Sequence, residues 1–138
     1  MFQGGTLLPL TLKENICFDK DFDLYKEECE KYDWFQALMR KFPKGIDTIL
    51  LTYMYPNGIQ PSGGEIQRVK LMRSLLKSSG IIVLDEPSNA LDPETEHQII
   101  SSIKKIKGER TMIIVSHNLS CSLYVDKIVH IQHGKVVE

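Results

Sequence analysis

Residues 81–86 read Ile81-Ile82-Val83-Leu84-Asp85-Glu86. Four consecutive apolar residues predict a short strand that is buried on both faces. The two acidic residues follow at its carboxyl end, the edge of an open α/β sheet where ligands bind. One carboxylate there can hold hydrated Mg²⁺, and the next can orient and deprotonate a water that attacks a phosphoryl group. A purely structural interpretation, in which the acids only end the strand, explains this hexapeptide about as well.

A glycine-containing tetrapeptide, Ser62-Gly63-Gly64-Glu65, predicts the start of a helix. Ser and Glu three residues apart form a capping box, in which each side chain accepts a hydrogen bond from the other residue's backbone N–H. The free N–H groups of a helix start, next to small glycines, can also receive a phosphate. On this segment alone, plain capping is the favoured interpretation. The apolar stripe of the helix follows at helical spacing, at Ile66, Val69, Met72 and Leu76.

After position 80, strand and helix patterns alternate. Further strands are expected at 111–116 and 127–132, because both are short apolar runs bounded by turn residues. Asp92-Pro93-Glu94 predicts the start of the intervening helix, with Asp as the N-cap and Pro in the first helical position. His133-Gly134 predicts a tight turn near the C-terminus. The alternation predicts an α/β fold with parallel strands and flanking helices.

Before position 81, the sequence predicts helices and loops. Thr11-Leu12-Lys13-Glu14 fits another capping box, so a short helix is expected to start there. Residues 23–31 and 34–41 are also expected to be helical. Residues 46–61 are expected to be irregular. The chain is therefore divided into a helical part and an α/β part near residue 80.

Size and composition fit one ordinary globular domain. The chain has 138 residues, of which 42% are hydrophobic and 25% charged, and its net charge is −1. That near-neutral charge gives no general case for binding nucleic acid or anionic lipid. Cys17, Cys29 and Cys121 are odd in number and far apart, so we expect reduced thiols and no metal site. No apolar run approaches the ~20 residues of a membrane span, and the N-terminus lacks the pattern of a signal peptide, so a cytoplasmic location is expected.

His117 directly follows the strand expected at 111–116. A single histidine is more often structural than functional, and the other histidines of the chain are interpreted that way. His117 differs because its strand is expected to lie in the same sheet as the strand that ends in Asp85 and Glu86. The carboxyl ends of parallel strands meet at one edge, so His117 could reach the same phosphate site.

Taken together and in order, these motifs resemble those of the ATP-binding-cassette (ABC) family. In that family an L-S-G-G-Q signature opens a helix, and a Walker B strand ending in Asp-Glu follows. A S-x-A-L-D segment, the D-loop, comes next, and the H-loop histidine follows a later strand. Phe2-Gln3 is similar to the family's Q-loop, and Leu12-Lys13-Glu14-Asn15-Ile16 and Gly45-Ile46-Asp47-Thr48 are similar to segments of ABC exporters. The resemblance covers essentially the whole chain, with its main matches at Ser62-Gly63-Gly64-Glu65, Leu84-Asp85-Glu86, Ser88-Asn89-Ala90-Leu91-Asp92 and Ser116-His117.

The resemblance implies a fold, a function and partners. The fold would be a partial P-loop NTPase core plus the ABC α-helical subdomain. The Q-loop, helical subdomain and signature helix would occupy 1–80, and the Walker B, D-loop and H-loop part of the core would occupy 81–138. The function would be that of an ABC transporter ATPase subunit, which couples ATP binding and hydrolysis to transmembrane transport, in the direction of export. A second ATP-binding domain in a head-to-tail dimer and a transmembrane domain would be its partners, at the cytoplasmic face of a membrane.

The resemblance also implies roles for single residues. Asp85 would coordinate Mg²⁺ through water, and Gln3 would sense the metal and the γ-phosphate of ATP. Glu86 would be the catalytic base, and His117 would contact the γ-phosphate. The signature and D-loop would act on the ATP of the opposite subunit, through Ser62, Gly63, Gly64, Glu65 and Asp92.

Two substitutions depart from the family signature. Pro61 stands where the family usually has Leu, and Glu65 stands where it usually has Gln. A carboxylate near a triphosphate is electrostatically unfavourable unless it turns back to cap the helix, which the capping-box spacing allows. Residues 50–60 also replace the charged, glycine-rich stretch with which exporters contact their membrane domain.

The sequence contains no G-x-x-x-x-G-K-[ST] motif, the P-loop that cradles the phosphates of ATP. In the family this motif precedes the Q-loop, so we interpret the 138 residues as a shortened polypeptide or as one piece of a split domain. Alone, they are expected to bind Mg-ATP weakly and not to hydrolyse it, and, because of exposed apolar surface, to self-associate or to be marginally stable. Two alternatives stay open: a non-catalytic binding or regulatory module, and a non-transport ABC ATPase of the DNA-repair or translation type. The near-neutral charge disfavours the second.

Overall fold

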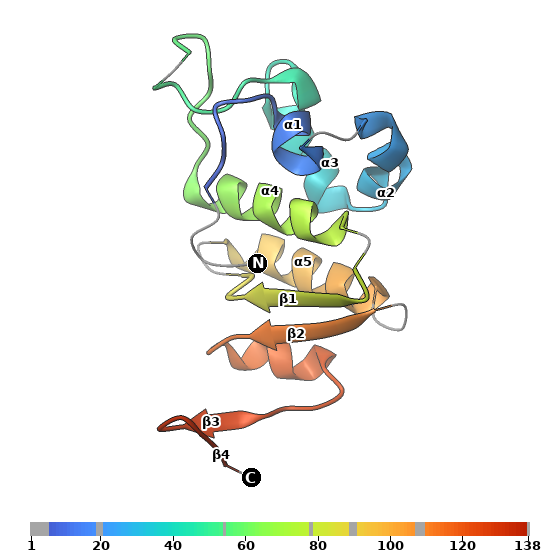
Figure 1. The fold of residues 1–138 in the computed structure, drawn as a ribbon, viewed down its shortest axis with the longest axis vertical. Helices are drawn as coiled ribbons and strands as arrows, with labels where there is room; N and C mark the ends of the chain where they lie inside the picture. The colour runs from blue at the N-terminus through green and yellow to red at the C-terminus, as the bar shows by residue number, and fades with distance from the viewer. Residues whose placement is uncertain are drawn as a thin grey trace.

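The computed structural model describes residues 6–18, 21–53, 55–77, 79–88, 91–106 and 110–137. Figure 1 shows helices gathered at one end, a small sheet below them and a hairpin at the other end. In chain order the elements are α1 (Leu12–Cys17), the 3₁₀ helix η1 (Phe22–Tyr25), α2 (Lys26–Glu30), α3 (Asp33–Lys41), η2 (Gly45–Asp47), α4 (Gly63–Leu75), β1 (Ile81–Asp85), α5 (Pro93–Ile106), β2 (Thr111–Val115), η3 (Leu119–Tyr124), β3 (His130–Gln132) and β4 (Lys135–Val137).

Helix α1 begins where its capping residue predicts. Thr11 caps α1, and the reciprocal capping box with Glu14 is formed. The helix expected at 23–31 is instead a 3₁₀ turn, η1, followed by the short helix α2. That turn begins at the buried Phe22, because Asp21 caps it by accepting a hydrogen bond from the amide of Asp23.

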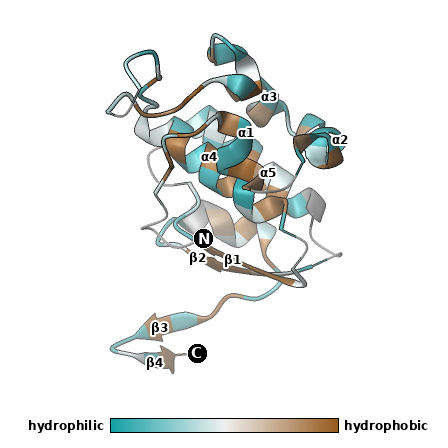
Figure 2. Ribbon diagram, turned by 45° about the horizontal axis from the view of Figure 1, so that its top comes forward, coloured by the Kyte–Doolittle hydropathy of each residue, from teal (hydrophilic) through white to brown (hydrophobic). Residues whose placement is uncertain are grey.

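Strands β1 and β2 pair in parallel, as expected, with Ile81 opposite Thr111 and Asp85 opposite Val115. The expectation that β1 is buried on both faces was wrong for the described residues. Ile82 and Leu84 are buried, but the side chains between them alternate to the other face, where Ile81 is 60% exposed. The reason is that helices cover one face of this two-stranded sheet and leave the other open (Figure 2).

The third expected strand also differs from its prediction. It is confined to β3, which pairs antiparallel with β4 in a separate two-stranded sheet. The turn between them is the predicted His133-Gly134, and both residues have positive φ, 49° and 74°, as a tight hairpin turn of the primed type requires. The segment between β2 and β3 contains the 3₁₀ helix η3.

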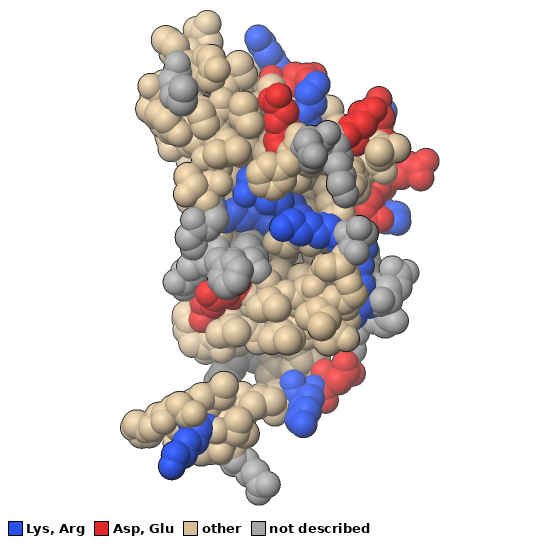
Figure 3. Space-filling model, viewed as in Figure 1, with Lys and Arg blue, Asp and Glu red and all other residues tan. Residues whose placement is uncertain are grey.

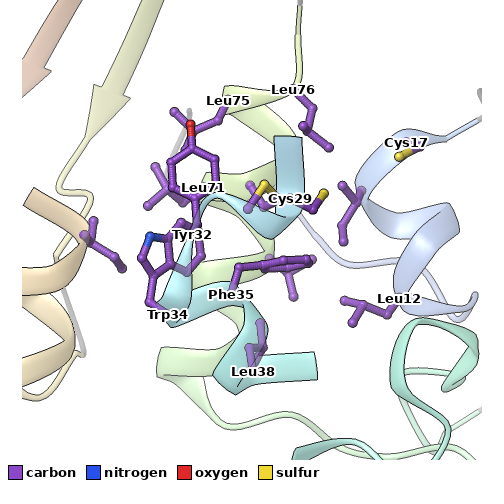
Figure 4. Packing of buried hydrophobic residues seen from close by; sticks show 14 of the residues in the cluster. Leu12, Cys17, Cys29, Tyr32, Trp34, Phe35, Leu38, Leu71, Leu75 and Leu76 are labelled. Atoms are coloured by element: carbon purple, nitrogen blue, oxygen red, sulfur yellow. The ribbon is translucent and has the colours of Figure 1, made fainter. Parts of the chain in front are cut away.

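One hydrophobic core joins the two halves of the chain. Figure 4 shows Trp34, Phe35 and Leu38 of α3 packed beside Leu71 and Leu75 of α4. Buried residues of β1 and α5 belong to the same cluster. A buried hydrogen bond of 3.1 Å from the indole of Trp34 to the hydroxyl of Ser102 fastens α3 to α5. The helical layer therefore holds α4 firmly against the sheet.

A fully buried asparagine fixes the chain before α1. The side-chain amide of Asn15 donates to the carbonyl oxygens of Leu8 at 2.9 Å, Leu10 at 3.2 Å and Thr11 at 3.1 Å. Its backbone carbonyl accepts a 2.6 Å hydrogen bond from Nε of Arg73 on α4. Because burying a polar amide is costly unless its hydrogen bonds are satisfied, this network specifies how α1 docks on α4.

On the face of the molecule that Figure 3 shows, basic and acidic side chains lie in separate areas. In Figure 3 basic side chains gather along α4, and acidic ones gather around η1 and α2. An expanse without charged side chains lies over β1 and β2. Within the described residues, no helix is long and apolar enough to cross a membrane.

The open face of the β1–β2 sheet predicts self-association. The apolar side chains on this face are 44–60% exposed, and they are Ile81, Val83, Ile113 and Val115. A contiguous apolar face of this kind favours association. Replacing Val83 and Val115 together by Lys should therefore lower the mass measured by light scattering.

The matched control for that experiment is Leu24→Lys, at a side chain that is 76% exposed but lies in η1, away from the sheet. It should leave the measured mass unchanged. A monomeric parent chain at high concentration would contradict the prediction.

Candidate functional site

The register of β1 and β2 brings two predicted site segments side by side. Asp85 ends β1 opposite Val115, which ends β2. The ladder continues for one more bond, from the amide of Glu86 to the carbonyl of Val115 at 2.8 Å. Glu86 and His117 therefore leave the sheet at the same edge, the edge at which open α/β folds bind ligands.

Glu86 and His117 are in direct contact. Oε1 of Glu86 accepts the backbone N–H of His117 at 3.1 Å and lies 2.8 Å from its Nδ1. An ionised carboxylate can only accept, so this contact favours the tautomer with the proton on Nδ1. Oε2 lies 3.4 Å from the hydroxyl of Ser116, a long contact that leaves it able to bind a water. The side chain of His117 is 84% exposed, and the side chain of Glu86 is 15% exposed.

The backbone of Glu86 has an unusual conformation. Its φ is 46°, in the left-handed region. For a residue other than glycine this costs on the order of 1–3 kcal/mol, and such strain is concentrated at functional sites. The amide of Gln67 on α4 donates to the carbonyl oxygen of Glu86 at 2.9 Å. The strained residue is therefore held from both the sheet and α4.

Asp85 is half-buried at the end of β1, next to Glu86. Among the described residues there is no group of three or more His, Cys, Asp or Glu side chains that could hold a metal ion. Mg²⁺ commonly keeps several waters and takes one or two protein carboxylates together with phosphate oxygens. The donor set at this edge therefore fits a phosphate-bound Mg²⁺ better than a site made of protein ligands alone.

The start of α4 is the capping box that its sequence predicts. Oγ of Ser62 accepts the amide of Glu65 at 3.3 Å, and Oε2 of Glu65 accepts the amide of Ser62 at 2.9 Å. The carboxylate thus turns back onto the helix start, as the departure from the family's Gln requires. Its other oxygen lies 3.8 Å from Nζ of Lys41 on α3, which reduces the negative charge that Glu65 presents.

Asp92 caps the following helix, as predicted. It accepts the amide of Thr95 at 2.9 Å and the hydroxyl of Thr95 at 2.6 Å. These hydrogen bonds, aided by the charge of Arg68, hold the pKa of Asp92 below its usual value. Nε of Arg68 is itself buried without a hydrogen-bond acceptor in the described part of the chain. Of the D-loop residues, Asn89 and Ala90 lie outside the described residues.

The predicted site residues thus form two groups. Asp85, Glu86 and His117 lie together at the sheet edge. The signature segment starts α4 on the same side of the molecule (Figure 1). Gln3 lies outside the described residues. A surface hollow of about 230 Å³ is lined by residues of α1, η1 and η2 and of the segment between α1 and η1, and by none of the predicted site residues.

Sequence reasoning assigned no role to two residues that contact the site, Gln67 and Lys41. Gln67 has its acceptor 19 positions further along the chain, and that acceptor is a backbone carbonyl, which carries no sequence signal. Lys41 reaches Glu65 from another helix. The first contact depends on how α4 packs against β1, and the second depends on how α3 packs against α4.

Comparison with known proteins identifies the family. The sequence profile of the family described as "ABC transporter" matches residues 1–89, more than half of the chain. That match includes the signature and the end of β1, and the sheet-edge geometry agrees with it. The chain belongs to the ABC transporter family, whose ATP-binding domains bind ATP with Mg²⁺.

Curated relatives agree with this assignment along the whole chain. An ATP-dependent lipid A-core flippase of Legionella pneumophila is 35% identical over 99% of the chain, and that of Haemophilus influenzae is 34% identical over 93%. The putative multidrug export ATP-binding/permease protein YgaD of Bacillus subtilis is 33% identical over 100%. The chain spans 22–23% of the length of these relatives.

The capping box at the start of α4 gives a stability prediction. Ser62→Ala removes a side-chain acceptor for an N–H of the first turn, so it should lower the free energy of unfolding by about 1 kcal/mol. Glu65→Ala should also destabilise the fold, whereas Glu65→Gln should be nearly neutral because Gln also closes the box. Urea unfolding followed by circular dichroism measures these differences. A larger loss for Glu65→Gln than for Glu65→Ala would contradict the assignment.

Proposed function

We propose that these residues are the signature-to-H-loop portion of an ABC exporter's ATP-binding domain, which hydrolyses ATP when the domain is complete. The observation that carries the proposal is the 2.8 Å contact of Glu86 with His117 at the carboxyl ends of two paired parallel strands. This contact holds the Glu86 carboxylate, which can accept a proton from a water, beside the exposed imidazole of His117. The names of the relatives, a lipid flippase and a multidrug export protein, favour export as the direction of transport.

The proposed roles follow from where each side chain lies. Glu86 takes the proton of the attacking water, and its Oε2 is the oxygen less engaged by hydrogen bonds. Nδ1 of His117 donates to Glu86, so Nε2 is the ring atom that faces the γ-phosphate, and it donates a hydrogen bond there when both ring nitrogens carry a proton. Asp85 would hold Mg²⁺ through water, and Gln3 would sense the metal and the γ-phosphate. The bound metal would supply positive charge to the phosphates of ATP.

The second proposed site element is the start of α4. Ser62, Gly63 and Gly64 present the free N–H groups of a helix N-terminus, which suit a phosphate on an opposing subunit. The contact with Lys41 and the capping hydrogen bond keep Glu65 from repelling that phosphate. We assign Asp92 to the same proposed interface. The proposed partners are therefore a second ATP-binding domain and a transmembrane domain, with no role for nucleic acid.

The division of the chain at residue 80 is part of the proposal. It falls between α4 and β1, so the helical subdomain and signature helix lie at 1–80 and the α/β part lies at 81–138. The shared core that joins α3 to α5 supports a fixed arrangement of the two parts.

The 138-residue polypeptide by itself should bind Mg-ATP more weakly than micromolar. The physical reason is that no P-loop motif is present in it to surround the β- and γ-phosphates with backbone N–H groups. Titration calorimetry with Mg-ATP measures this affinity. Micromolar binding by the isolated chain would overturn this expectation and would show that the sheet edge suffices for nucleotide binding.

Catalysis is tested in a chimaeric domain, in which a segment that carries a G-x-x-x-x-G-K-[ST] motif is joined ahead of residue 1. Glu86→Gln should lower its ATP hydrolysis rate by roughly 10²–10⁴-fold, the usual contribution of a general base, and should leave ATP binding intact. Glu94→Gln, at an exposed acid in the first turn of α5, is the matched control and should leave the rate unchanged. Equal rates of ATP hydrolysis for Glu86→Gln and the parent would contradict the proposed role of Glu86.

A further inference from the structure

The conformation of Glu86 needs an external support. Its left-handed φ of 46° is unfavourable for a residue with a side chain. It also precedes Pro87, and the residue before a proline prefers extended backbone. Without a constraint, Glu86 would relax toward the extended region and its side chain would turn away from the direction of His117.

Two hydrogen bonds hold the backbone of Glu86 from opposite sides. Its N–H donates to the carbonyl of Val115 at 2.8 Å, which continues the sheet ladder. Its carbonyl oxygen accepts the side-chain amide of Gln67 at 2.9 Å. The first bond fixes where Glu86 leaves the sheet, and the second fixes the orientation of the peptide that follows.

Gln67 is well placed to give this support. It is half-buried on α4, and neighbouring members of that helix, Val69, Leu71 and Met72, are fully buried. The position of its amide is therefore set by the core and not by solvent. Gln67 lies five residues after Ser62, the N-cap of the same helix.

We propose that Gln67 is a positioning residue, whose amide holds the Glu86 carbonyl so that the Glu86 carboxylate faces His117. The contact also links the signature helix to the base of its own subunit's site. A movement of α4 relative to β1 would therefore change the direction in which the Glu86 carboxylate points. The proposal rests on the proposed function only in naming Glu86 as the base, because the geometry exists without nucleotide.

The test measures the tautomer of the His117 ring by NMR, in the 138-residue chain labelled with ¹⁵N-histidine. Long-range ¹H–¹⁵N spectra distinguish the Nδ1–H tautomer from the Nε2–H tautomer, and His117→Gln assigns the signal. The parent chain should show His117 as the Nδ1–H form. Gln67→Met, which keeps the length of the side chain but removes its donor, should convert His117 to the tautomer mixture of a free imidazole.

Controls separate positioning from general damage. Gln36→Met makes the same change at a half-buried glutamine of α3 and should leave the His117 pattern unchanged. The single tryptophan reports on the fold, because the indole N–H of Trp34 is buried against Ser102. Gln67→Glu, which also lacks the donor but keeps a polar side chain, repeats the test in case the Met variant does not fold.

A loss of the Nδ1–H pattern with a native Trp34 signal supports the proposal. An unchanged His117 pattern in a folded Gln67 variant overturns it. Loss of the Trp34 signal in both variants also overturns it, because Gln67 would then support the fold as a whole. Since no nucleotide is present, failure of ATP hydrolysis in the completed domain would count against the proposed function and not against this role of Gln67.

Discussion

The parallel register of β1 and β2 is the constraint on which the site depends. Because Asp85 lies opposite Val115, the residues that follow the two strands emerge as neighbours although they are 31 positions apart. A shift of one residue would send the side chains of a whole strand to the other face of the sheet. It would also separate the carboxylate of Glu86 from the imidazole of His117. Correct pairing of two strands is therefore a condition for the chemistry.

Helix α4 supplies the second constraint, because it contacts several separate parts of the molecule. Its first turn is the signature segment, Gln67 contacts the backbone of Glu86, and Arg73 binds the carbonyl of Asn15. Beyond its C-terminal end, the guanidinium of Arg110 donates to the carbonyls of Leu75 and Lys77. A helix held at so many points transmits displacement as a rigid element. This is the property that an ATP-binding domain needs if events at one nucleotide are to affect another.

Much of this arrangement could be predicted from sequence where the signal is local. The capping boxes of α1 and α4 and the Asp92 cap of α5 are formed as expected, because each depends on residues three positions apart. The β1–β2 pairing could be expected from the alternation of strand and helix. The exposure of Ile81 could not, since an apolar run is the same whether its second face is covered or open. The contact of Gln67 with Glu86 and the left-handed φ of Glu86 depend on packing between elements and leave no pattern in the sequence.

The β3–β4 hairpin differs from the rest of the fold. It consists of two three-residue strands, and every residue from His130 to Val136 is exposed. A two-stranded hairpin of this kind is marginally stable by itself in water. Local opening should therefore cost far less free energy here than in β1, whose buried side chains belong to the core. In native-state hydrogen exchange, the hairpin and the β1–β2 sheet should therefore behave as two separate cooperative units, and proteolysis should remove the first without disturbing the second.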